Sequence, residues 1–419
     1  MRTTMFPAHD ACAGIYIHIP FCIRKCAYCD FLSAPAGEAV QKAYADQLNR
    51  ELLQVCDRMK TEEMAISTIY FGGGTPSILP GEQIARLMET LKVYGNILPD
   101  AEITLEMNPG TVSREKLKLY RQAGINRLSI GAQSFHDQEL KLLGRIHTCE
   151  EFMNAYEEAR QEGFSNISLD LMSGLPGQTA EQWRENLQRA ISLKPEHISA
   201  YSLIIEEGTP FYEQYGEDWS EGNEELDRQM YEDTKQILEQ AGYLRYEISN
   251  YARPGYESRH NTSYWTGVSY YGCGLGASSL VKTEEGWFRT QNETDLERYL
   301  KTDAFSWGKT EELTLWSETE KLPSQVETEK LPSQVEIEKL TLQAQMEEFM
   351  FLGLRLTRGI DILEFEQRFP QEKSFDAIYG AIVAELVEDG LMEQNGTRIA
   401  LTERGLDLSN YCFEKFLLD

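Results

Sequence analysis

Six consecutive strand-and-helix units constrain the fold of this chain more than any other feature. Short runs rich in β-branched residues recur from Ile15 to Leu203, and a segment with helical periodicity and a charged outer face follows each of the first five. The expected strands are 15–19, 68–71, 103–107, 127–130, 167–171 and 197–203, and the expected helices are 43–58, 81–93, 114–123, 150–162 and 180–193. Such units give parallel strands. The sequence therefore predicts an α/β fold, a partial (β/α)6 barrel, with its chemistry at the carboxyl ends of the strands.

Beyond this barrel domain, which we place at 1–245 with a further helix at 224–241, the pattern changes. Residues 246–305 are rich in Tyr, Gly and Asn and predict a loop-rich, β-containing C-terminal extension of the barrel. In 306–341 the sequence Glu-Thr-Glu-Lys-Leu-Pro-Ser-Gln-Val occurs twice in tandem, at 318–335. A unit with so few apolar residues cannot bury a core, which predicts an acidic linker built on a nine-residue repeat.

The last segment, 342–419, predicts a small winged-helix-like α+β domain. Helices are expected at 343–355 and 374–389, a hairpin between 390 and 402, and a final helix over 403–416. Domains of this type often bind DNA, but this one has no basic recognition face, so we expect it to act as a scaffold.

The charge of the chain excludes several classes of function. There are 40 Lys and Arg against 68 Asp and Glu, a formal net charge of −28, which argues against partners that are nucleic acid or an anionic membrane surface. No apolar run approaches the 18 or so residues of a membrane span, and no basic stretch followed by an apolar core opens the chain. These features predict a cytoplasmic protein.

The strongest chemical signal is a cysteine triplet directly after the first strand. Cys22, Cys26 and Cys29 are spaced C-x3-C-x2-C, and three thiolates on one short loop can hold three irons of a 4Fe–4S cluster, which leaves the fourth iron open. A structural zinc site would need a fourth Cys or His, usually from a second C-x2-C pair, and the chain has no such pair. His18 is a conceivable fourth ligand for zinc. The pattern favours the cluster.

This triplet, with an aromatic residue before its last cysteine, resembles the radical S-adenosylmethionine (SAM) superfamily. More narrowly, the chain resembles the oxygen-independent coproporphyrinogen III oxidase group. The matching motifs are Tyr16-Ile-His-Ile-Pro-Phe-Cys22, Gly72-Gly-Gly-Thr-Pro76, Glu106-Met-Asn-Pro109, Gly131-Ala-Gln-Ser-Phe135, Asp170-Leu-Met-Ser-Gly-Leu-Pro176 and His260-Asn-Thr-Ser-Tyr-Trp265. The resemblance implies a radical-SAM barrel in which the open iron binds SAM, and reductive cleavage gives methionine and a 5′-deoxyadenosyl radical.

The resemblance also implies roles for individual residues. Gly73, Gly74 and Thr75 would contact the amino group of SAM, while Glu106 and Arg145 would hold its polar groups and carboxylate. The remaining candidates are Tyr16 and Tyr28, which would contact SAM and flank its adenine, and Gln133 and Asp170, which would line the cavity above the cluster for a second SAM or a substrate.

One departure from the oxidase pattern decides between functions. The pattern typical of the oxidases is C-x3-C-x2-C-x-C, but in this chain Phe31 stands at the position of the fourth cysteine. Cys29-Asp-Phe31, His260-Asn-x-x-Tyr-Trp265 and Glu348-Phe-Met-Phe-Leu-Gly-Leu-Arg355 are similar to the HemW branch of the group, whose members are haem chaperones. That branch implies haem as a third ligand and haem-requiring, often membrane-bound, acceptor proteins as partners.

Two other functions stay open at this point. One is oxidative decarboxylation of coproporphyrinogen III to protoporphyrinogen IX, and the other is radical SAM chemistry on an unknown substrate. Either would need a reductant for the cluster, and a homodimer is left open. A haem iron needs an axial ligand, and the candidates are His18, His136, His147, His197 and His260, with His9 less favoured. We prefer His260 because Tyr264 and Trp265 lie beside it in the sequence.

Overall fold

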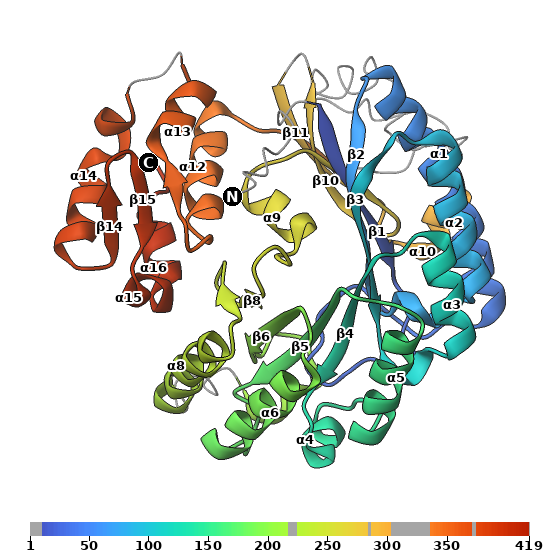
Figure 1. Cartoon of the computed structure of the whole chain (residues 1–419). Coiled ribbons are helices and arrows are strands. Elements are labelled where there is room, and N and C mark those ends of the chain that lie inside the picture. The colour runs from blue at the N-terminus through green and yellow to red at the C-terminus, as the bar shows by residue number, and fades with distance from the viewer. Residues whose placement is uncertain (1–10, 217–223, 284–285, 303–335, 371–373, 419) are drawn as a thin grey trace.

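The computed structural model describes residues 11–216, 224–283, 286–302, 336–370 and 374–418. Their central feature is one curved sheet with the strand order β12-β11-β10-β9-β1-β2-β3-β4-β5-β6-β8-β7. Figure 1 shows this sheet as an arc, with α1, α2, α3 and α5 along its convex side and α9 on its concave side. The prediction of an α/β fold built on a partial barrel is confirmed.

The first six strands pair in parallel and form the barrel. Their bounds are β1 Cys12–Ile19, β2 Ala65–Gly73, β3 Ile97–Met107, β4 Arg127–Gln133, β5 Ile167–Ser173 and β6 His197–Ser202. The helices between them are α1 Glu38–Thr61, α2 Gly81–Tyr94, α3 Arg114–Ala123, α4 Asp137–Leu142, α5 Cys149–Gln161 and α6 Ala180–Leu193, with short 3-10 turns at Pro76–Ile78 and Pro109–Thr111. The structure adds α4 to the expected helices and starts α1 five residues earlier.

Side chains alternate along these strands between an apolar outer face and a polar inner face. In β4 the residues Leu128, Ile130 and Ala132 are fully buried in the core between the sheet and its outer helices. The residues that alternate with them, Arg127, Ser129, Gly131 and Gln133, face the inside of the barrel. Most parallel sheets are apolar on both faces. The polar inner face of this one therefore marks the barrel interior as a place for ligands.

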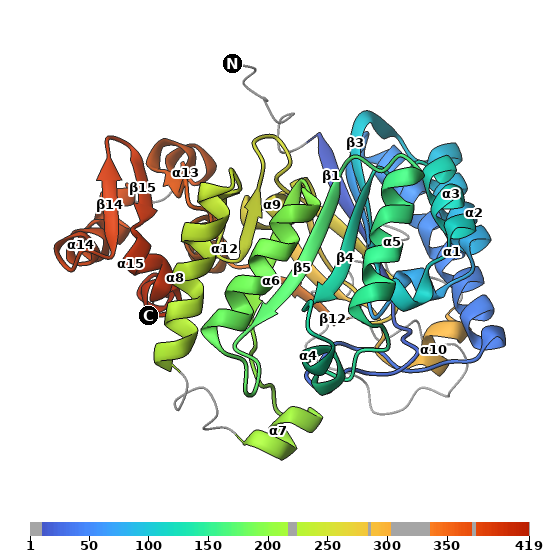
Figure 2. The same cartoon turned by 60° about the horizontal axis from the view of Figure 1, so that its bottom comes forward.

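The segment 246–305 extends the sheet at both of its edges. On one side β8 Asn250–Ala252 pairs with β6 and with β7 Leu244–Arg245. On the other side β9 Tyr270–Cys273 pairs in parallel with β1, followed by β10 Ser278–Thr283 and β11 Gly286–Gln291. The helices of this segment are α9 Arg259–Trp265 and α10 Leu296–Lys301, and α7 Pro210–Tyr215 and α8 Glu224–Gln240 precede it in the chain. Figure 2 shows α4 and α7 beyond the carboxyl ends of β4 and β5.

The predicted linker needs one correction. Its two full repeats, 318–335, lie outside the described residues, but Glu336–Lys339 forms strand β12 and pairs antiparallel with β11. This segment carries a single β-branched residue, Ile337, so its local sequence does not predict a strand. The exposed edge of β11 supplies the hydrogen-bond partners that make it one.

The C-terminal domain packs around its own core and a three-stranded sheet, β13 Ile360–Asp361, β15 Arg398–Leu401 and β14 Met392–Asn395. Its helices are α12 Leu342–Gly353, α13 Ile362–Arg368, α14 Phe375–Glu388, α15 Glu403–Asp407 and α16 Ser409–Glu414. The prediction of a single final helix over 403–416 is wrong, because two short helices, α15 and α16, occupy this segment. The backbone leaves the helical region at Leu408, and the break lets Leu406 on one side and Cys412 and Phe416 on the other reach the same core.

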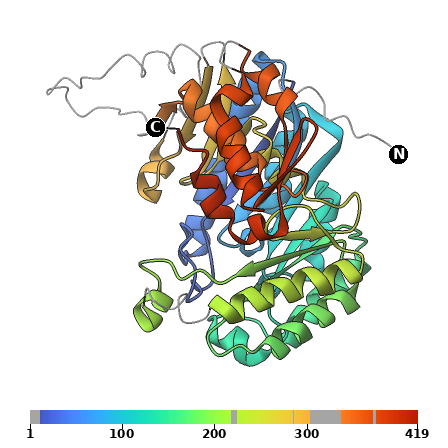
Figure 3. The same ribbon diagram turned by 90° about the vertical axis from the view of Figure 1, so that its left-hand side faces the viewer.

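Ion pairs fasten this domain to the barrel. Arg245, which is almost fully buried, and Lys235 both reach Glu403, each at 2.6 Å, and Arg289 of β11 reaches Glu348 of α12 at 2.8 Å. Figure 3 shows the domain in front of the upper part of the sheet, with α8 below it.

Candidate functional site

A cavity of about 460 Å³ occupies the interior of the barrel. It opens beside the loop that follows β1, and its walls come from β2 to β6 and from α9. Eleven of the thirteen predicted site residues line it, which are Cys22, Cys26, Cys29, Tyr28, Gly73, Gly74, Thr75, Glu106, Gln133, Arg145 and Asp170. Residues spread over about 150 positions of the sequence thus share one surface, because parallel strands bring their carboxyl ends together.

The cysteine loop is held in place on two sides. The Ala27 amide donates to the carbonyl of Leu143 after α4, at 3.0 Å, and the Ala27 carbonyl accepts from the Phe211 amide of α7, also at 3.0 Å. Phe211 and Leu143 belong to a small apolar cluster against which Tyr28 packs. The loop is therefore fixed by backbone bonds rather than by a metal alone.

The three thiols provide a donor set for a cubane cluster. All three are free and partly exposed on the cavity wall. Each thiolate of a cubane site binds a different iron, so three thiolates on one loop can hold three of its four irons. The donor set and its spacing therefore fit a 4Fe–4S cluster.

The glycine loop after β2 lies directly against the cysteine loop. A Cβ atom on Gly74 would come within 2.8 Å of the Phe21 carbonyl oxygen and 3.0 Å of the Cys22 Sγ. Gly73 has a φ of 112° and leaves no space for a Cβ beside the ring of His18. Only glycine permits this approach, which leaves backbone amides beside the cysteine loop.

Glu106 is one of the carboxyl groups that line the cavity. Burial raises its pKa to about 7 and neighbouring Asp170 adds to the rise, while the Tyr70 hydroxyl, which donates to Oε1 at 2.7 Å, acts in the opposite direction. The side chain can therefore change charge near neutral pH, and a cationic ligand beside it would favour the carboxylate.

Arg145 lies between the cysteine loop and β4. Its Nη2 donates to the Gly131 carbonyl at 2.8 Å, and its Nη1 points toward the Cys26 Sγ at 3.8 Å. The rest of the guanidinium faces the cavity, beside Gln133, whose φ of 62° is rare for a residue with a side chain. Strain of this kind often marks a functional position.

Asp170 lies on β5 and is already surrounded by hydroxyl groups. Ser129 donates to its two oxygens at 3.2 and 3.1 Å, and Ser168 donates at 3.4 Å. Burial raises its pKa, and the hydroxyl groups counter part of that rise.

Two predicted residues lie outside the cavity wall. The Tyr16 ring lies beside the stacked pair of Tyr70 and His260, and its hydroxyl pairs with Nδ1 of His18 at 3.0 Å. His260 is 1% exposed, its Nδ1 lies 2.8 Å from the Thr68 hydroxyl, and its Nε2 lies 2.8 Å from the Tyr264 hydroxyl. Burial, with a contribution from Arg127, lowers the pKa of His260 to about 3, so the ring is neutral. In this arrangement neither nitrogen is available to an iron.

The other described histidines do not line the cavity either. His18, His147 and His197 are buried, and each pairs through Nδ1 or Nε2 with a neighbouring oxygen. His136 lies at the start of α4 near Glu185, with a separation of 3.5 Å. His9 lies outside the described residues.

Several cavity residues were not predicted from the sequence. They are Tyr70, Arg127, Ser129, Ser199, Tyr201 and Asn261. The signal that could have found most of them is the two-residue period of a strand, since Arg127 and Ser129 share a face with Gln133. Asn261 comes from α9 and enters the site only through the fold.

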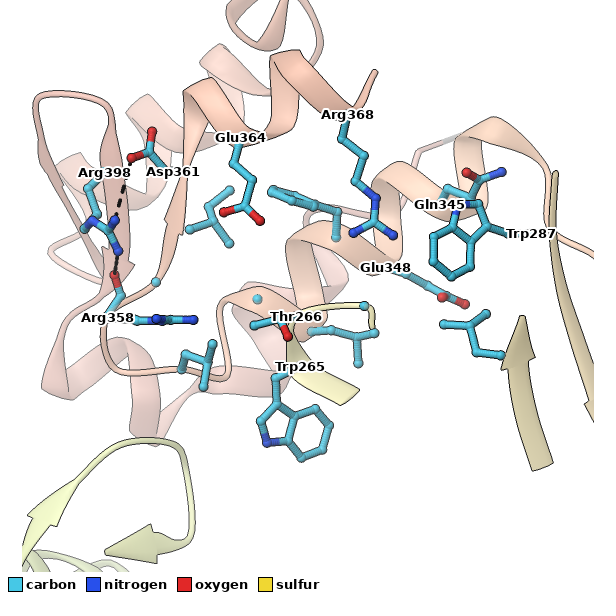
Figure 4. Close-up of a pocket in the computed structure, with 18 of the residues that line it drawn as sticks. Trp265, Thr266, Trp287, Gln345, Glu348, Arg358, Asp361, Glu364, Arg368 and Arg398 are labelled. Carbon is cyan, nitrogen blue, oxygen red and sulfur yellow. Dashed lines mark hydrogen bonds and ion pairs between the residues drawn. The ribbon is translucent and has the colours of Figure 1, made fainter. Parts of the chain in front are cut away.

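A second, smaller pocket of about 120 Å³ lies between α9, β10, β11 and the C-terminal domain. Figure 4 shows Glu364 and Arg368 of α13 across the pocket from Trp265, with Trp287 at one end and the Arg398–Asp361 pair at the other. It holds none of the predicted site residues. Helix α9 contributes to both cavities, Asn261 to the first and Trp265 to the second.

In the part of the chain that the structure describes, no helix combines the length and the apolar character needed to cross a membrane.

Comparison with known proteins adds the family. The Radical SAM superfamily profile matches residues 16–190, and the HemN C-terminal domain profile matches residues 340–408. The chain is 36% identical to heme chaperone HemW of Bacillus subtilis over 411 residues, which cover 96% of this chain and 98% of that protein. It is 41% identical to the Escherichia coli protein of the same name over 274 residues, 65% of this chain and 71% of that one.

Among solved structures, the coproporphyrinogen III oxidase HemN of E. coli, described as a radical SAM enzyme, superposes with a TM-score of 0.76 at 23% identity. The match covers 98% of this chain and 91% of that one. The similarity extends through the barrel, the extension and the C-terminal domain, and at this identity it establishes the fold. Since the end-to-end relatives share more than a third of their residues with it, the chain belongs to the HemW family of the radical SAM superfamily.

Proposed function

We propose that this protein is a haem chaperone that binds a 4Fe–4S cluster, SAM and haem and delivers the haem to acceptor proteins. The observation that carries the proposal is the full-length match to relatives named heme chaperone, together with Phe31 at the cavity wall. Phe31 is 62% exposed and stands at the position of the fourth cysteine in the oxidase pattern. An exposed apolar ring on the wall of this cavity suits a ligand with an apolar face.

Cys22, Cys26 and Cys29 would hold the cluster, which together with SAM supplies one-electron reductive chemistry when both are bound. The chain's own residues would orient SAM. Backbone carbonyl groups of the glycine loop and the carboxylate of Glu106 suit an ammonium group, which only donates, while the Arg145 fork suits a carboxylate. Tyr28 would flank the adenine, and Gln133 and Asp170 would bind a second ligand beside SAM. Tyr16 would act from behind Tyr70 through its ring stacking.

The axial ligand of haem stays a proposal with a structural condition attached. His260 can bind iron only if α9 moves, because both of its ring nitrogens are hydrogen-bonded. His260→Ala tests it: loss of the Soret band on haem addition, with cluster content unchanged, supports a ligand role. An unchanged Soret band restricts His260 to packing.

Two assays on anaerobically reconstituted protein separate the chaperone from the oxidase. Haem titration should give a stable Soret band, and haem should pass to an apo-acceptor. Incubation with coproporphyrinogen III, SAM and a reductant should give no vinyl product, and stoichiometric protoporphyrinogen would refute the chaperone proposal. Phe31→Cys should also stay inactive, because the fourth cysteine is not a cluster ligand.

The SAM assignment has its own matched pair of variants. Arg145→Ala should weaken SAM binding by about 1.5–3 kcal/mol, the contribution of a hydrogen bond to a charged group. Lys118→Ala, an exposed change on α3, should have no effect. Equal SAM affinity in both variants would remove Arg145 from the site.

A further inference from the structure

Arg127 is the one cation at the inner end of the cavity among the residues described there. It is the first residue of β4 and Gln133 is the last, so about 20 Å of strand separates them at ~3.3 Å per residue. Arg127, Ser129, Gly131 and Gln133 all line the cavity, as alternate residues of one strand should. Arg145 bonds near the outer end of this row, at Gly131, and Arg127 lies at the inner end.

The Arg127 guanidinium is buried without hydrogen-bond partners. Its residue is 2% exposed, its Nε atom is buried and unpaired, and none of the described residues accepts a hydrogen bond from it or lies in an ion pair with it. A buried guanidinium carries five N–H donors and is costly to leave unsatisfied. Buried polar groups in proteins are nearly always paired with protein, water or ligand.

The nearby carboxylates are occupied elsewhere. Glu102 accepts the backbone N–H groups of Arg259 and His260 at the start of α9, at 3.1 and 3.0 Å. Asp170 accepts serine hydroxyls, and Glu106 accepts the Tyr70 hydroxyl. Burial works against the Arg127 charge, but Glu102 and Asp170 act at longer range and keep its pKa above the ordinary value. Charge is therefore balanced nearby, while the donors still face the cavity.

We propose that Arg127 binds a carboxylate of a second ligand in the inner half of the cavity, separate from the carboxylate of SAM at Arg145. This rests on the proposed function, and the carboxylate that fits a haem chaperone is a propionate of the tetrapyrrole. The Asn261 amide lines the same cavity and can supply a neutral donor, whereas the Ser129 and Ser199 hydroxyls are bonded to Asp170. The amino-acid carboxylate of a second SAM molecule has the same chemistry and is the other source to be tested.

The first experiment uses the wild-type, cluster-loaded protein and two probes, haem with free propionates and haem dimethyl ester, each titrated by its Soret band. The preference for the free acid is the Kd of the ester divided by the Kd of the acid. This preference should be about ten- to a hundredfold larger in the wild type than in Arg127→Met, the change expected when a hydrogen bond to a charged group is lost. Arg127→Lys, which keeps the charge but not the fork, should retain part of the preference. Arg145→Met should keep all of it while it weakens SAM binding.

The possible outcomes separate this proposal from the proposed function. Equal binding of acid and ester by the wild type overturns the propionate source even if the Arg127 variants fail to fold. No binding of either probe overturns the haem chaperone proposal. The second source is then tested by SAM stoichiometry: a fall from two molecules to one in Arg127→Met supports the carboxylate site. Unchanged stoichiometry and unchanged acid preference mean that Arg127 meets only water, and they overturn the inference.

Discussion

Glu106 should make the protein less stable as the pH rises, which is unusual for a carboxyl group. Burial raises its pKa from 4.5 to about 7. Between these values the folded protein keeps a proton that the unfolded chain has already released, so each step up in pH weakens the fold. The full effect of a shift of this size is about 3 kcal/mol, of which roughly 2 kcal/mol falls between pH 5.5 and 8. Because the side chain faces a wet cavity, screening reduces the latter to about 1–2 kcal/mol.

The perturbation that isolates this contribution is Glu106→Gln. The amide oxygen of glutamine can still accept the Tyr70 hydroxyl, so shape and hydrogen bond are kept while the titration is removed. The stability advantage of the variant over the wild type should be larger at pH 8 than at pH 5.5 by about 1–2 kcal/mol. In a chain of this length that corresponds to a difference in Tm of about 1–2 °C.

The assay is anaerobic thermal unfolding of cluster-loaded, SAM-free protein at the two pH values. Glu393→Gln, on an exposed position of β14, is the control for removing one negative charge and should leave the pH dependence of the wild type unchanged. The reasoning is refuted if Glu106→Gln lowers Tm by the same amount at both pH values, since the residue would then contribute only contacts. It is also refuted if the glutamate control reproduces the effect.

Three further predictions follow from the same geometry. Serine at any one position of the cysteine triplet should abolish the iron and sulfide content of reconstituted protein, whereas Cys149→Ser should leave it intact; equal loss would mean a wrong ligand set. Tyr70→Phe removes the hydrogen bond that lowers the pKa of Glu106, so the pH at which SAM affinity is half-maximal should rise by about 1–2 units. Titration of SAM binding from pH 6 to 9 measures this, and an unchanged midpoint would show that Tyr70 does not control the charge of Glu106. Gly359→Ala would place a Cβ 1.8 Å from the Ile399 carbonyl oxygen at a φ of 62°, so the C-terminal domain should melt well below the barrel in calorimetry; a wild-type thermogram would contradict this packing.

The sequence by itself determined the barrel and many of the residues that line its cavity. Apolar periodicity is a local property, and each of the six units is long enough to show it, so the strands and helices of 12–202 other than α4 were predictable, with ends that differ by at most six residues. The position of a residue at the carboxyl end of a parallel strand then fixes its place in space. For this reason the cysteine loop, the glycine loop, Glu106 and Asp170 could be assigned to one site before any coordinates were available.

Only the tertiary structure decided which other segments join the sheet and which side chains are available to a ligand. The strands β7, β8, β9 and β12 carry too few residues for a local signal and form because neighbouring strands of the sheet offer them partners. The state of His260 depends on Thr68, which is 192 positions away in the sequence, and its motif alone could not show that both nitrogens are engaged. Arg127 likewise has no hydrogen-bond partner among the described residues because the carboxylates near it accept hydrogen bonds from other groups. Hydrogen bonding between residues far apart in the chain is a property of the fold, and no sequence window contains it.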